Sequence, residues 1–376
     1  MRFGILSTYP PTRCGLASFT QSLETALTDT GRDEVVVVRS LDEPVGSGGP
    51  PSHGGRAPRA ELIAGDRASR RRAAAALDAC DIVIVQHEYG IYGGPDGEEV
   101  VDLLAMLQTP VVAVLHTVLP SPSAHQRAVL ESVCAHAASV VVITVLARDV
   151  LVSRYRVAPD KVVVIPHGVA AHQRPAAPAE RSGRRRIITW GLLSPAKGIE
   201  WGIRAVGRLR DLGVEYVIAG QTHPKVRAAQ GESYREHLRH VIRELGLESS
   251  VTLDDRYLDD RELDELLASA DAVLLPYESS EQATSGVLAE AVAAGVPVVA
   301  TRFPHAVDLL SGGAGIIAAH SDPASMAQAL RTLLEADDDA RRDRQTAAAD
   351  TAPVTWAAAA DDFRALARAV MAERAA

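Results

Sequence analysis

Short runs of β-branched and aliphatic residues alternate along this chain with longer stretches in which apolar residues recur every three or four positions. The short runs predict strands and the longer stretches predict helices. Most of the short runs are apolar throughout, as expected for a parallel sheet that is covered by helices on both faces. The twelve predicted strands are residues 3–7, 34–39, 81–86, 110–116, 139–144, 161–166, 186–190, 215–219, 251–254, 271–276, 296–301 and 314–318.

Six strands in each half predict an α/β fold with two Rossmann-like, doubly wound parallel-sheet domains that face each other across a cleft. We expect the first domain at residues 1–180, the second at 181–354 and a separate helix at 355–376. The stretch 170–185, rich in Ala, Pro, Gly and Arg, is typical of a linker. Residues 42–59 contain Gly, Pro and Ser but few apolar residues, which predicts a surface loop.

Composition narrows the class of protein. The 376 residues are 47% hydrophobic and 23% charged. No apolar run approaches the ~18 residues that cross a bilayer, so we expect no transmembrane segment, whereas peripheral membrane contact stays open. The net charge of −9 argues against nucleic acid as the main partner. Three cysteines without metal-ligand spacing or a disulfide framework, together with an N-terminus that lacks a signal-peptide pattern, favour the cytoplasm.

The segment 191–198 contains a cation at an unusual place. Lysine occurs only at positions 161, 197 and 225. Ser194 resembles an N-cap and Pro195 a first helical residue, so Lys197 is predicted in the first turn of a helix. A helix dipole disfavours a cation there by several tenths of a kcal/mol, and a bound anion would reverse that effect. A solvated lysine is the simpler reading, but the pattern favours phosphate binding.

A second helix start is expected beside this one. With strand order 3-2-1-4-5-6, the loops after the first and fourth strands of a domain diverge and open a crevice. In the second half, the fourth-strand loop leads to Ser285 as an N-cap and Gly286, and Gly295 ends the helix. Two helix N-termini, one of them with a lysine, suit a diphosphate held by the amides of 285–287. Glu290 is then placed to accept hydrogen bonds from ribose hydroxyls, unless it is an ordinary surface carboxylate.

The first half offers hydroxyl-binding candidates by the same geometry. Its first strand leads into the loop 8–16, its third into the polar-aromatic stretch 86–94, and its fourth ends at His116. His116 and His167 could each have a structural role instead of a functional one, and for His167 we favour a structural or hinge role. His87-Glu88 lacks the second histidine of a zinc protease, and Asp254-Asp255 lacks a third ligand, so we expect no metal site.

Together these motifs resemble the retaining GT-B glycosyltransferases of family 4 over nearly the whole chain. The motifs are Cys14-Gly15-Leu16, His116, Ile-Pro-x-Gly-Val at 165–169, Gly-x-Leu-x-x-x-Lys-Gly at 191–198, Ser-Gly-Val-Leu-Ala-Glu-Ala at 285–291 and Ala-Gly-Val-Pro-Val-Val-Ala at 294–300. The resemblance implies transfer of a sugar from a nucleoside diphosphate donor, with retention at the anomeric carbon and without an essential metal or cofactor. It also implies that the helix after Thr355 packs back on the first domain.

Two positions depart from the family pattern. The arginine usual after the first glycine of the phosphate loop is replaced by Leu192, so another cation is expected to assist Lys197. The first residue of the family's spaced glutamate pair is Gln282. An amide cannot act as nucleophile or general base, so a front-face mechanism is favoured. The candidates for the second cation are Arg13, Arg256 and Arg302.

The leading hypothesis is therefore a hexosyltransferase that uses GDP- or UDP-linked mannose or glucose, with an unidentified acceptor. The alternatives are a sugar-nucleotide 2-epimerase and a non-catalytic nucleotide-sugar binding protein. The predicted catalytic residues are His116, Lys197 and Gln282. The predicted donor-binding residues are Gly15, Gly191, Lys197, Arg256, Ser285, Gly286, Val287 and Glu290, and those on the acceptor side are Arg13, His87, Glu88, Tyr89 and Tyr92.

Overall fold

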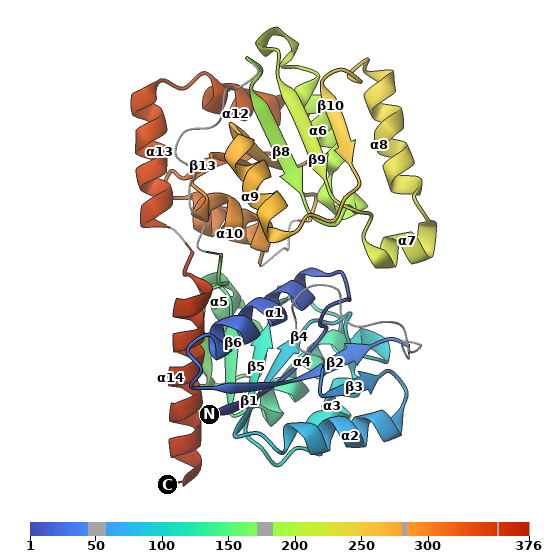
Figure 1. Ribbon diagram of the computed structural model, residues 1–376, viewed down its shortest axis with the longest axis vertical. Coiled ribbons are helices and arrows are strands. Elements are labelled where there is room, and N and C mark those ends of the chain that lie inside the picture. The colour runs from blue at the N-terminus through green and yellow to red at the C-terminus, as the bar shows by residue number, and fades with distance from the viewer. Residues whose placement is uncertain (44–57, 171–182, 280–283, 352, 376) are drawn as a thin grey trace. The chain divides into compact units, whose positions relative to one another are not determined.

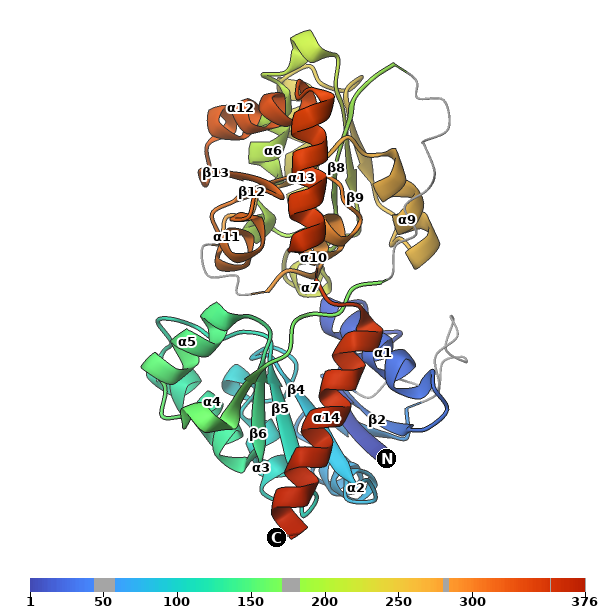
Figure 2. The same cartoon turned by 90° about the vertical axis from the view of Figure 1, so that its left-hand side faces the viewer.

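The computed structural model describes residues 1–43, 58–170, 183–279, 284–351 and 353–375. They form two compact units, Met1–Gly168 with Val354–Ala376, and Val169–Pro353. Each unit is a parallel sheet with helices on both faces (Figures 1 and 2). The expected linker lies largely outside the described residues, as does most of the loop 42–59. The boundaries at 180 and 354 therefore remain predictions.

The first sheet has seven strands among the described residues, in the order β3-β2-β1-β4-β5-β6-β7. Its strands are β1 (Arg2–Ser7), β2 (Glu34–Leu41), β3 (Ala60–Ile63), β4 (Ile82–His87), β5 (Val111–Leu115), β6 (Ser139–Val142) and β7 (Val162–Val164). Its helices are α1 (Gly15–Thr28), α2 (Arg67–Leu77), α3 (Glu99–Leu104), α4 (Ala124–His136), α5 (Val145–Arg154) and α14 (Trp356–Ala375), with short 3₁₀ turns η1 (Pro95–Gly97) and η2 (Pro159–Lys161).

The sequence pattern missed β3. This four-residue strand is half-buried except for Leu62 and lies at the open edge of the sheet, so it lacks the continuous apolar run of a central strand. The omission changes the topology, because the strand that pairs with β1 is β4 and not the strand that ends before His116. The sequence-based placement of His116 beside the first strand was therefore wrong.

The second sheet has six strands among the described residues, in the predicted order 3-2-1-4-5-6, here β10-β9-β8-β11-β12-β13. They are β8 (Arg186–Trp190), β9 (Glu215–Ala219), β10 (Val251–Asp254), β11 (Ala272–Leu275), β12 (Val298–Thr301) and β13 (Gly315–Ala318). The helices are α6 (Ile199–Val206), α7 (Pro224–Gln230), α8 (Ser233–Glu244), α9 (Asp260–Ser269), α10 (Gly286–Ala293), α11 (Pro304–Leu310), α12 (Pro323–Leu334) and α13 (Asp338–Asp350), with 3₁₀ turns η3 (Pro195–Lys197) and η4 (Arg210–Leu212).

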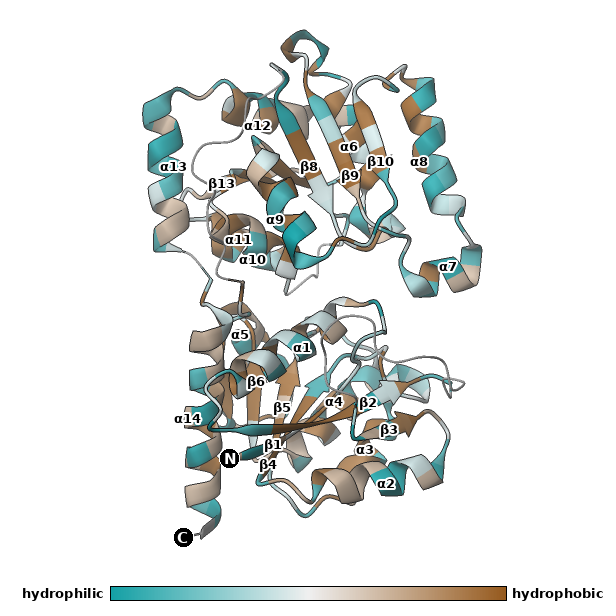
Figure 3. Ribbon diagram, viewed as in Figure 1, coloured by the Kyte–Doolittle hydropathy of each residue, from teal (hydrophilic) through white to brown (hydrophobic). Residues whose placement is uncertain are grey.

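Each sheet separates two hydrophobic clusters, because successive side chains of a strand point to opposite faces. In β1, Phe3 and Ile5 pack toward α1 and α14, whereas Leu6 packs toward the cluster that contains α2 and α4 residues. Figure 3 shows the apolar strands between helices whose outer faces are polar. The sheets therefore form rigid platforms whose carboxyl edges carry the candidate site residues.

The C-terminal helix α14 packs on the first unit. Phe363, Ala367 and Val370 share a buried cluster with β1 and α1, and α14 lies beside α1 (Figure 2). Arg364, only 7% exposed, donates from Nε to Asp33 at 2.6 Å and from Nη2 to the carbonyl of Leu27 at 2.9 Å. Because Leu27 belongs to the last turn of α1, Arg364 stabilises the carbonyl end of that helix.

Candidate functional site

In the second unit, the loop after β8 and the loop after β11 lie together at the carboxyl edge of the sheet. The amide of Glu278 donates to the carbonyl of Ala196 at 3.0 Å. A Cβ built on Gly191 would lie 3.5 Å from Cγ2 of Val287. The structure thus brings Gly191 next to Val287 at the start of α10, and the turn that contains Lys197 next to the segment that follows β11.

The local structure at Lys197 differs from the prediction. Residues Pro195–Lys197 form the 3₁₀ turn η3, Ser194 makes no side-chain cap, and α6 begins only at Ile199. Gly198 separates the two with φ of +56°, and a Cβ there would lie 2.3 Å from the carbonyl oxygen of Pro276. The loop after β11 is pressed against this turn and prevents a continuous helix. The helix-dipole argument for Lys197 was therefore wrong.

Lys197 nevertheless occupies a defined position. Its side chain is half-buried, and Nζ lies 3.7 Å from the centroid of the Tyr277 ring. His223 lies nearby, since the positive charges of Lys225 and Lys197 add to burial in lowering the pKa of its imidazole. The sequence prediction missed both Tyr277 and His223. A signal for His223 exists, because the polar residues Gln221 and Thr222 precede it directly after a strand adjacent to β8.

The start of α10 matches the expected cap. Ser285 Oγ accepts from the amide of Leu288 at 3.2 Å, and Gly295 follows the helix with φ of +67°. The amide of Ser285 itself donates to Nδ1 of His305 at 2.8 Å, so this predicted phosphate donor is already used. Helix geometry leaves the amides of Gly286 and Val287 without intrahelical acceptors. These two amides are the available anion donors at this helix start.

Glu290 lies one turn further into α10, half-buried among apolar residues. Burial raises the pKa of its carboxyl to about 7, against the lowering effect of a hydrogen bond with the side chain of Trp190. The carboxylates of Asp260 and Asp264 raise it further. Near neutral pH the Glu290 carboxyl is therefore divided between its charged form, an acceptor only, and its protonated form, which also donates.

Arg256, a candidate for the second cation, is paired with carboxylates in this structure. Its guanidinium lies 2.6 Å from Asp254 and 2.8 Å from Glu262. Arg302 is exposed directly after β12, and Leu192 is half-buried in the loop after β8. Gln282 lies outside the described residues.

In the first unit, polar side chains lie at the carboxyl ends of three adjacent strands, β1, β4 and β5, on the same face of the sheet. The register pairs Leu6 with Val85, which places Ser7 beside Gln86, and His116 directly follows β5. His116 Nε2 and Gln86 Oε1 form a hydrogen bond. Alternation puts all three on the face that packs against α1 and α14. The ring of Phe19 in α1 stands edge-on to His116, with centroids 4.8 Å apart.

The histidines at this edge are neutral. Burial lowers the pKa of His116 to about 3, and the charges of His167 and His87 lower it further. His167 is held in an aromatic group with Phe19 and Trp356, and burial lowers its pKa to about 4. At physiological pH these rings can therefore bind hydroxyl groups through hydrogen bonds but carry no charge. His167 packs against Phe19 and Trp356, which agrees with a structural role.

The predicted acceptor residues divide into a surface and a buried set. His87 and Tyr92 are 0% and 5% exposed, and Tyr92 donates to the carbonyl of Gln86 at 2.7 Å. The expectation that they contact an acceptor was wrong, because they support the loop from within the core. Glu88 and Tyr89 are half-buried, and Glu88 Oε1 accepts from the amide of Tyr89 at 3.0 Å.

The start of α1 completes the carboxyl edge of the first sheet. Gly15 begins α1 and is exposed, as is Arg13 in the loop before it. Cys14 caps the helix, with Sγ accepting from the amide of Ala17 at 3.4 Å. The two exposed positions thus lie where a ligand at this edge would approach the helix.

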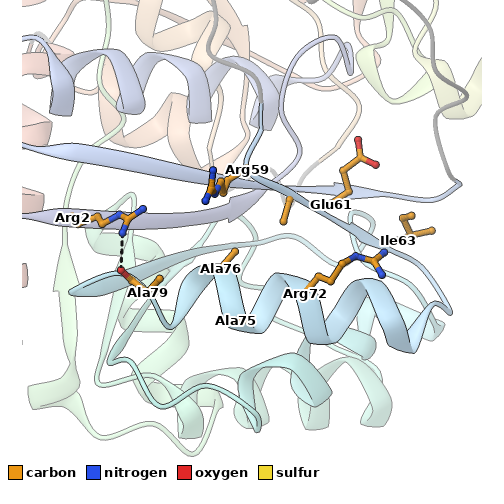
Figure 4. A pocket seen from close by; sticks show the side chains of 9 residues that line it. Arg2, Arg59, Glu61, Ile63, Arg72, Ala75, Ala76 and Ala79 are labelled. Atoms are coloured by element: carbon orange, nitrogen blue, oxygen red, sulfur yellow. Dashed lines mark hydrogen bonds between the residues drawn. The ribbon is translucent and has the colours of Figure 1, made fainter.

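A cavity of about 500 Å³ lies elsewhere in the first unit, between α2 and β3 (Figure 4). Two of the arginines that line it have partners: Arg2 Nη1 donates to the carbonyl of Ala79 at 3.2 Å, and Arg72 lies 3.8 Å from Asp66. None of the predicted site residues contributes to it. The cavity is lined by Arg2, Arg59, Ala60, Glu61, Ile63, Arg72, Ala75, Ala76 and Ala79.

The described part of the chain shows neither a metal-binding cluster nor a membrane-spanning helix. No group of three or more His, Cys, Asp or Glu side chains there is arranged to hold a metal ion. None of the described helices combines the length and apolarity needed to span a bilayer. The three cysteines are free thiols, of which Cys80 and Cys134 are buried.

Two family models match the chain. "Glycosyltransferase Family 4" matches residues 14–173 and "Glycosyl transferases group 1" matches residues 184–336. The chain is 31% identical to a D-inositol 3-phosphate glycosyltransferase of Stackebrandtia nassauensis, over 62% of this chain and 54% of the relative. It is 33% identical to a glycogen synthase of Mycobacterium tuberculosis, over 50% of this chain and 43% of the relative. The chain spans about half the length of these curated relatives.

Solved structures share the fold over nearly the full length. Anabaena HepE in complex with UDP and glucose has a TM-score of 0.76 at 15% identity and covers 98% of this chain and 100% of its own. A sucrose-phosphate synthase from Thermosynechococcus elongatus has a TM-score of 0.75 at 15% identity, and the match covers 99% of this chain and 100% of the synthase chain. Both are therefore similar in fold to this chain.

Proposed function

Because the chain belongs to the GT-B glycosyltransferases of family 4, we propose that it transfers a hexose from a nucleoside diphosphate sugar to a hydroxyl acceptor. The observation that carries this proposal is the grouping of Lys197, the amides of Gly286 and Val287, and Glu290 at the switch point between β8 and β11. A cation and two helix-start amides suit a diphosphate, and a carboxyl group one turn away suits ribose hydroxyls.

The donor is proposed to be GDP- or UDP-linked mannose or glucose. Anabaena HepE, which shares the fold, forms a complex with UDP and glucose, and this supports the proposed class of donor. His116 is the candidate for contact with a sugar hydroxyl, because its neutral ring can hydrogen-bond without attracting an anion. Arg13, which is exposed, and Glu88 and Tyr89, which are half-buried, are candidates for the acceptor side. We propose a cytoplasmic location on the three free thiols.

The proposed reaction retains the configuration of the anomeric carbon. The bond between that carbon and the β-phosphate oxygen breaks while the acceptor oxygen attacks from the same face. The acceptor proton passes to the departing β-phosphate oxygen, so no protein base is required. Gln282 supports this route, because an amide cannot form a glycosyl ester. Lys197 would stabilise the negative charge that develops on the leaving diphosphate.

The test is a calorimetric screen of GDP, UDP and ADP sugars, followed by assays for released nucleoside diphosphate. The proposal expects binding of one donor class and release that increases when acceptor is added. For Lys197→Ala we expect kcat/KM to fall by about 30- to 1,000-fold, since one charged contact contributes about 2–4 kcal/mol. Lys161→Ala, which changes a lysine of the first unit, is the matched control. Unchanged kinetics in Lys197→Ala would refute the phosphate assignment.

A further inference from the structure

We propose that Tyr277 is the positioning residue for Lys197: its ring holds the ammonium in place without neutralising it. This inference rests on the proposed function, in which Lys197 meets the donor diphosphate. Nζ of Lys197 lies 3.7 Å from the ring centroid, well inside the ~6 Å range of a cation–π contact. In this role Tyr277 positions the ammonium of Lys197 and does not itself contact the donor. Tyr277 is not part of the donor-binding motifs.

The ring is itself immobile. Tyr277 is 0% exposed and stacks on Phe303 with centroids 5.1 Å apart and an angle of 21° between the planes. Its carbonyl oxygen accepts from Thr301 Oγ1 at 2.6 Å and from Nδ1 of His320 at 2.9 Å. Both the ring and the main chain of Tyr277 are therefore fixed by the core of the second unit.

The same segment also fixes the main chain of Lys197. The carbonyl of Ala196 accepts from the amide of Glu278, and Gly198 leaves room for the carbonyl of Pro276. Residues on both sides of Tyr277 thus determine where the lysine backbone lies, while the ring determines where its ammonium lies. A lysine that is already ordered loses less side-chain entropy when it meets its ligand.

A ring suits this task better than a carboxylate. An acidic partner would cancel the charge that a diphosphate needs, whereas an aromatic face attracts the ammonium and leaves its net charge intact. Among the described residues, no carboxylate forms an ion pair with Lys197. The neighbouring Glu278 is directed elsewhere, since it accepts from Trp201 Nε1 and from Ser321 Oγ at 3.2 Å.

The hydroxyl of Tyr277 has no part in this role. It is buried, and no described residue hydrogen-bonds to it. Tyr277→Phe therefore keeps the ring and removes only an unsatisfied polar atom, while Tyr277→Leu removes the aromatic face. These two variants form a matched pair that separates the ring from its substituent.

The first experiment needs no ligand. Because the chain has only three lysines, ¹³C-lysine labelling gives three sets of ε-methylene signals, and Lys197→Arg identifies the one from Lys197. We expect that signal to be shifted upfield by the ring current in the wild type and in Tyr277→Phe, and to return to the ordinary position in Tyr277→Leu. An ordinary shift in the wild type would overturn the contact.

The second experiment measures binding of GDP and UDP in a double-mutant cycle. We expect Tyr277→Leu to weaken binding 5- to 30-fold when Lys197 is present and less than twofold in a Lys197→Met background. Tyr277→Phe should stay within twofold of the wild type. Equal losses in both backgrounds would show that the ring only supports the fold, and would overturn the proposal.

A volume-preserving variant guards against loss of folding in Tyr277→Leu. Placing 3,4,5-trifluorophenylalanine at position 277 keeps the shape and withdraws electron density, so binding should weaken relative to Tyr277→Phe. Equal affinity in these two proteins would overturn the proposal. If the wild type binds neither nucleotide, the proposed function and the role in donor binding both fail, while the ligand-free lysine signals still decide whether the ring holds the ammonium.

Discussion

The carboxyl edges of the two sheets share a strand order but carry different chemistry. In the second unit, the first strand and its neighbour end beside a lysine, two helix-start amides and a carboxyl group, Glu290. In the first unit, Gln86 lies near the end of β4, the neighbour of β1, and His116 follows β5, the next strand; Phe19 packs against His116, and burial keeps the His116 ring neutral. The edge of the second unit thus presents a cation and two helix-start amides, whereas the edge of the first unit presents neutral hydrogen-bonding side chains.

This difference shows how one topology supports two kinds of recognition. A parallel sheet collects loop residues at its carboxyl edge whatever their chemistry. The residues then differ in chemistry: the ammonium of Lys197 lies over an aromatic ring, whereas burial lowers the pKa of His116 and leaves its ring neutral. Three experiments test the contrast, each on a different part of it.

The largest effect is expected from removing an ion pair that holds α14 on the first unit, the unit that carries the neutral edge. Arg364→Ala should destabilise the first unit by about 2–4 kcal/mol, because Asp33 is 6% exposed on its side chain and, of the described residues, keeps only the terminal ammonium of Met1 as a partner. The last carbonyls of α1 also lose their donor. Hydrogen exchange followed by mass spectrometry should show faster exchange in the first unit and unchanged exchange in the second.

Arg368→Ala on the same helix is the matched control, since Arg368 is exposed. It should leave exchange in both units as in the wild type. If Arg364→Ala accelerates exchange equally in the second unit, the two cores are not independent and the comparison between the edges loses its basis.

A smaller effect is expected for the neutral hydrogen-bonding residue. His116→Ala should lower kcat/KM by about 5- to 30-fold, the equivalent of about 1–2 kcal/mol for one hydrogen bond to the sugar. With a pKa of about 3, His116 is neutral across pH 5–8, so the wild-type and variant pH profiles should be parallel. The measurement is kcat/KM at each pH.

The exposed His125 on α4 provides the control for this variant. Its ring is bound by Asp96 and Glu98, and His125→Ala should leave kcat/KM unchanged. An ionisation near pH 6–7 that disappears in His116→Ala would contradict the assignment of a neutral ring at this edge.

The smallest effect concerns the carboxyl group of the charged edge. The pKa of the Glu290 carboxyl is raised from 4.5 to about 7 in the folded protein. The protonated carboxyl therefore stabilises the folded state fully below pH 4.5, and this stabilisation is lost as the pH rises through about 7. Glu290→Gln should therefore be more stable than the wild type at pH 8, by about 1 kcal/mol or a few °C in Tm after allowance for partial exposure.

Thermal unfolding at pH 5 and pH 8 measures this difference. The gain should be absent at pH 5, where both side chains are largely neutral, and Glu248→Gln at an exposed position should show no gain at either pH. A variant that is less stable than the wild type at pH 8 would mean that the Glu290 carboxylate is stabilised by a partner and is not held near neutrality by burial.

Much of this architecture was predictable from local patterns. The six strands of the second sheet, the cap at Ser285 and the helix end at Gly295 follow from apolar runs and from residues with strong positional preferences. These signals are local, because a side chain caps the helix that it precedes. The four-residue edge strand β3 gave no such signal, and its omission displaced His116 from its true place in the sheet.

The sequence by itself thus determined the fold class, the chain order of nearly all the strands and the presence of Lys197, Glu290 and His116 in loops and helices at strand ends. Only the tertiary structure decided that β4 is the neighbour of β1, that Lys197 lies on a 3₁₀ turn, and that Tyr277 holds its ammonium. The physical reason is distance along the chain. Tyr277 meets Lys197 across eighty residues, and no periodicity within a single element encodes a contact between two loops.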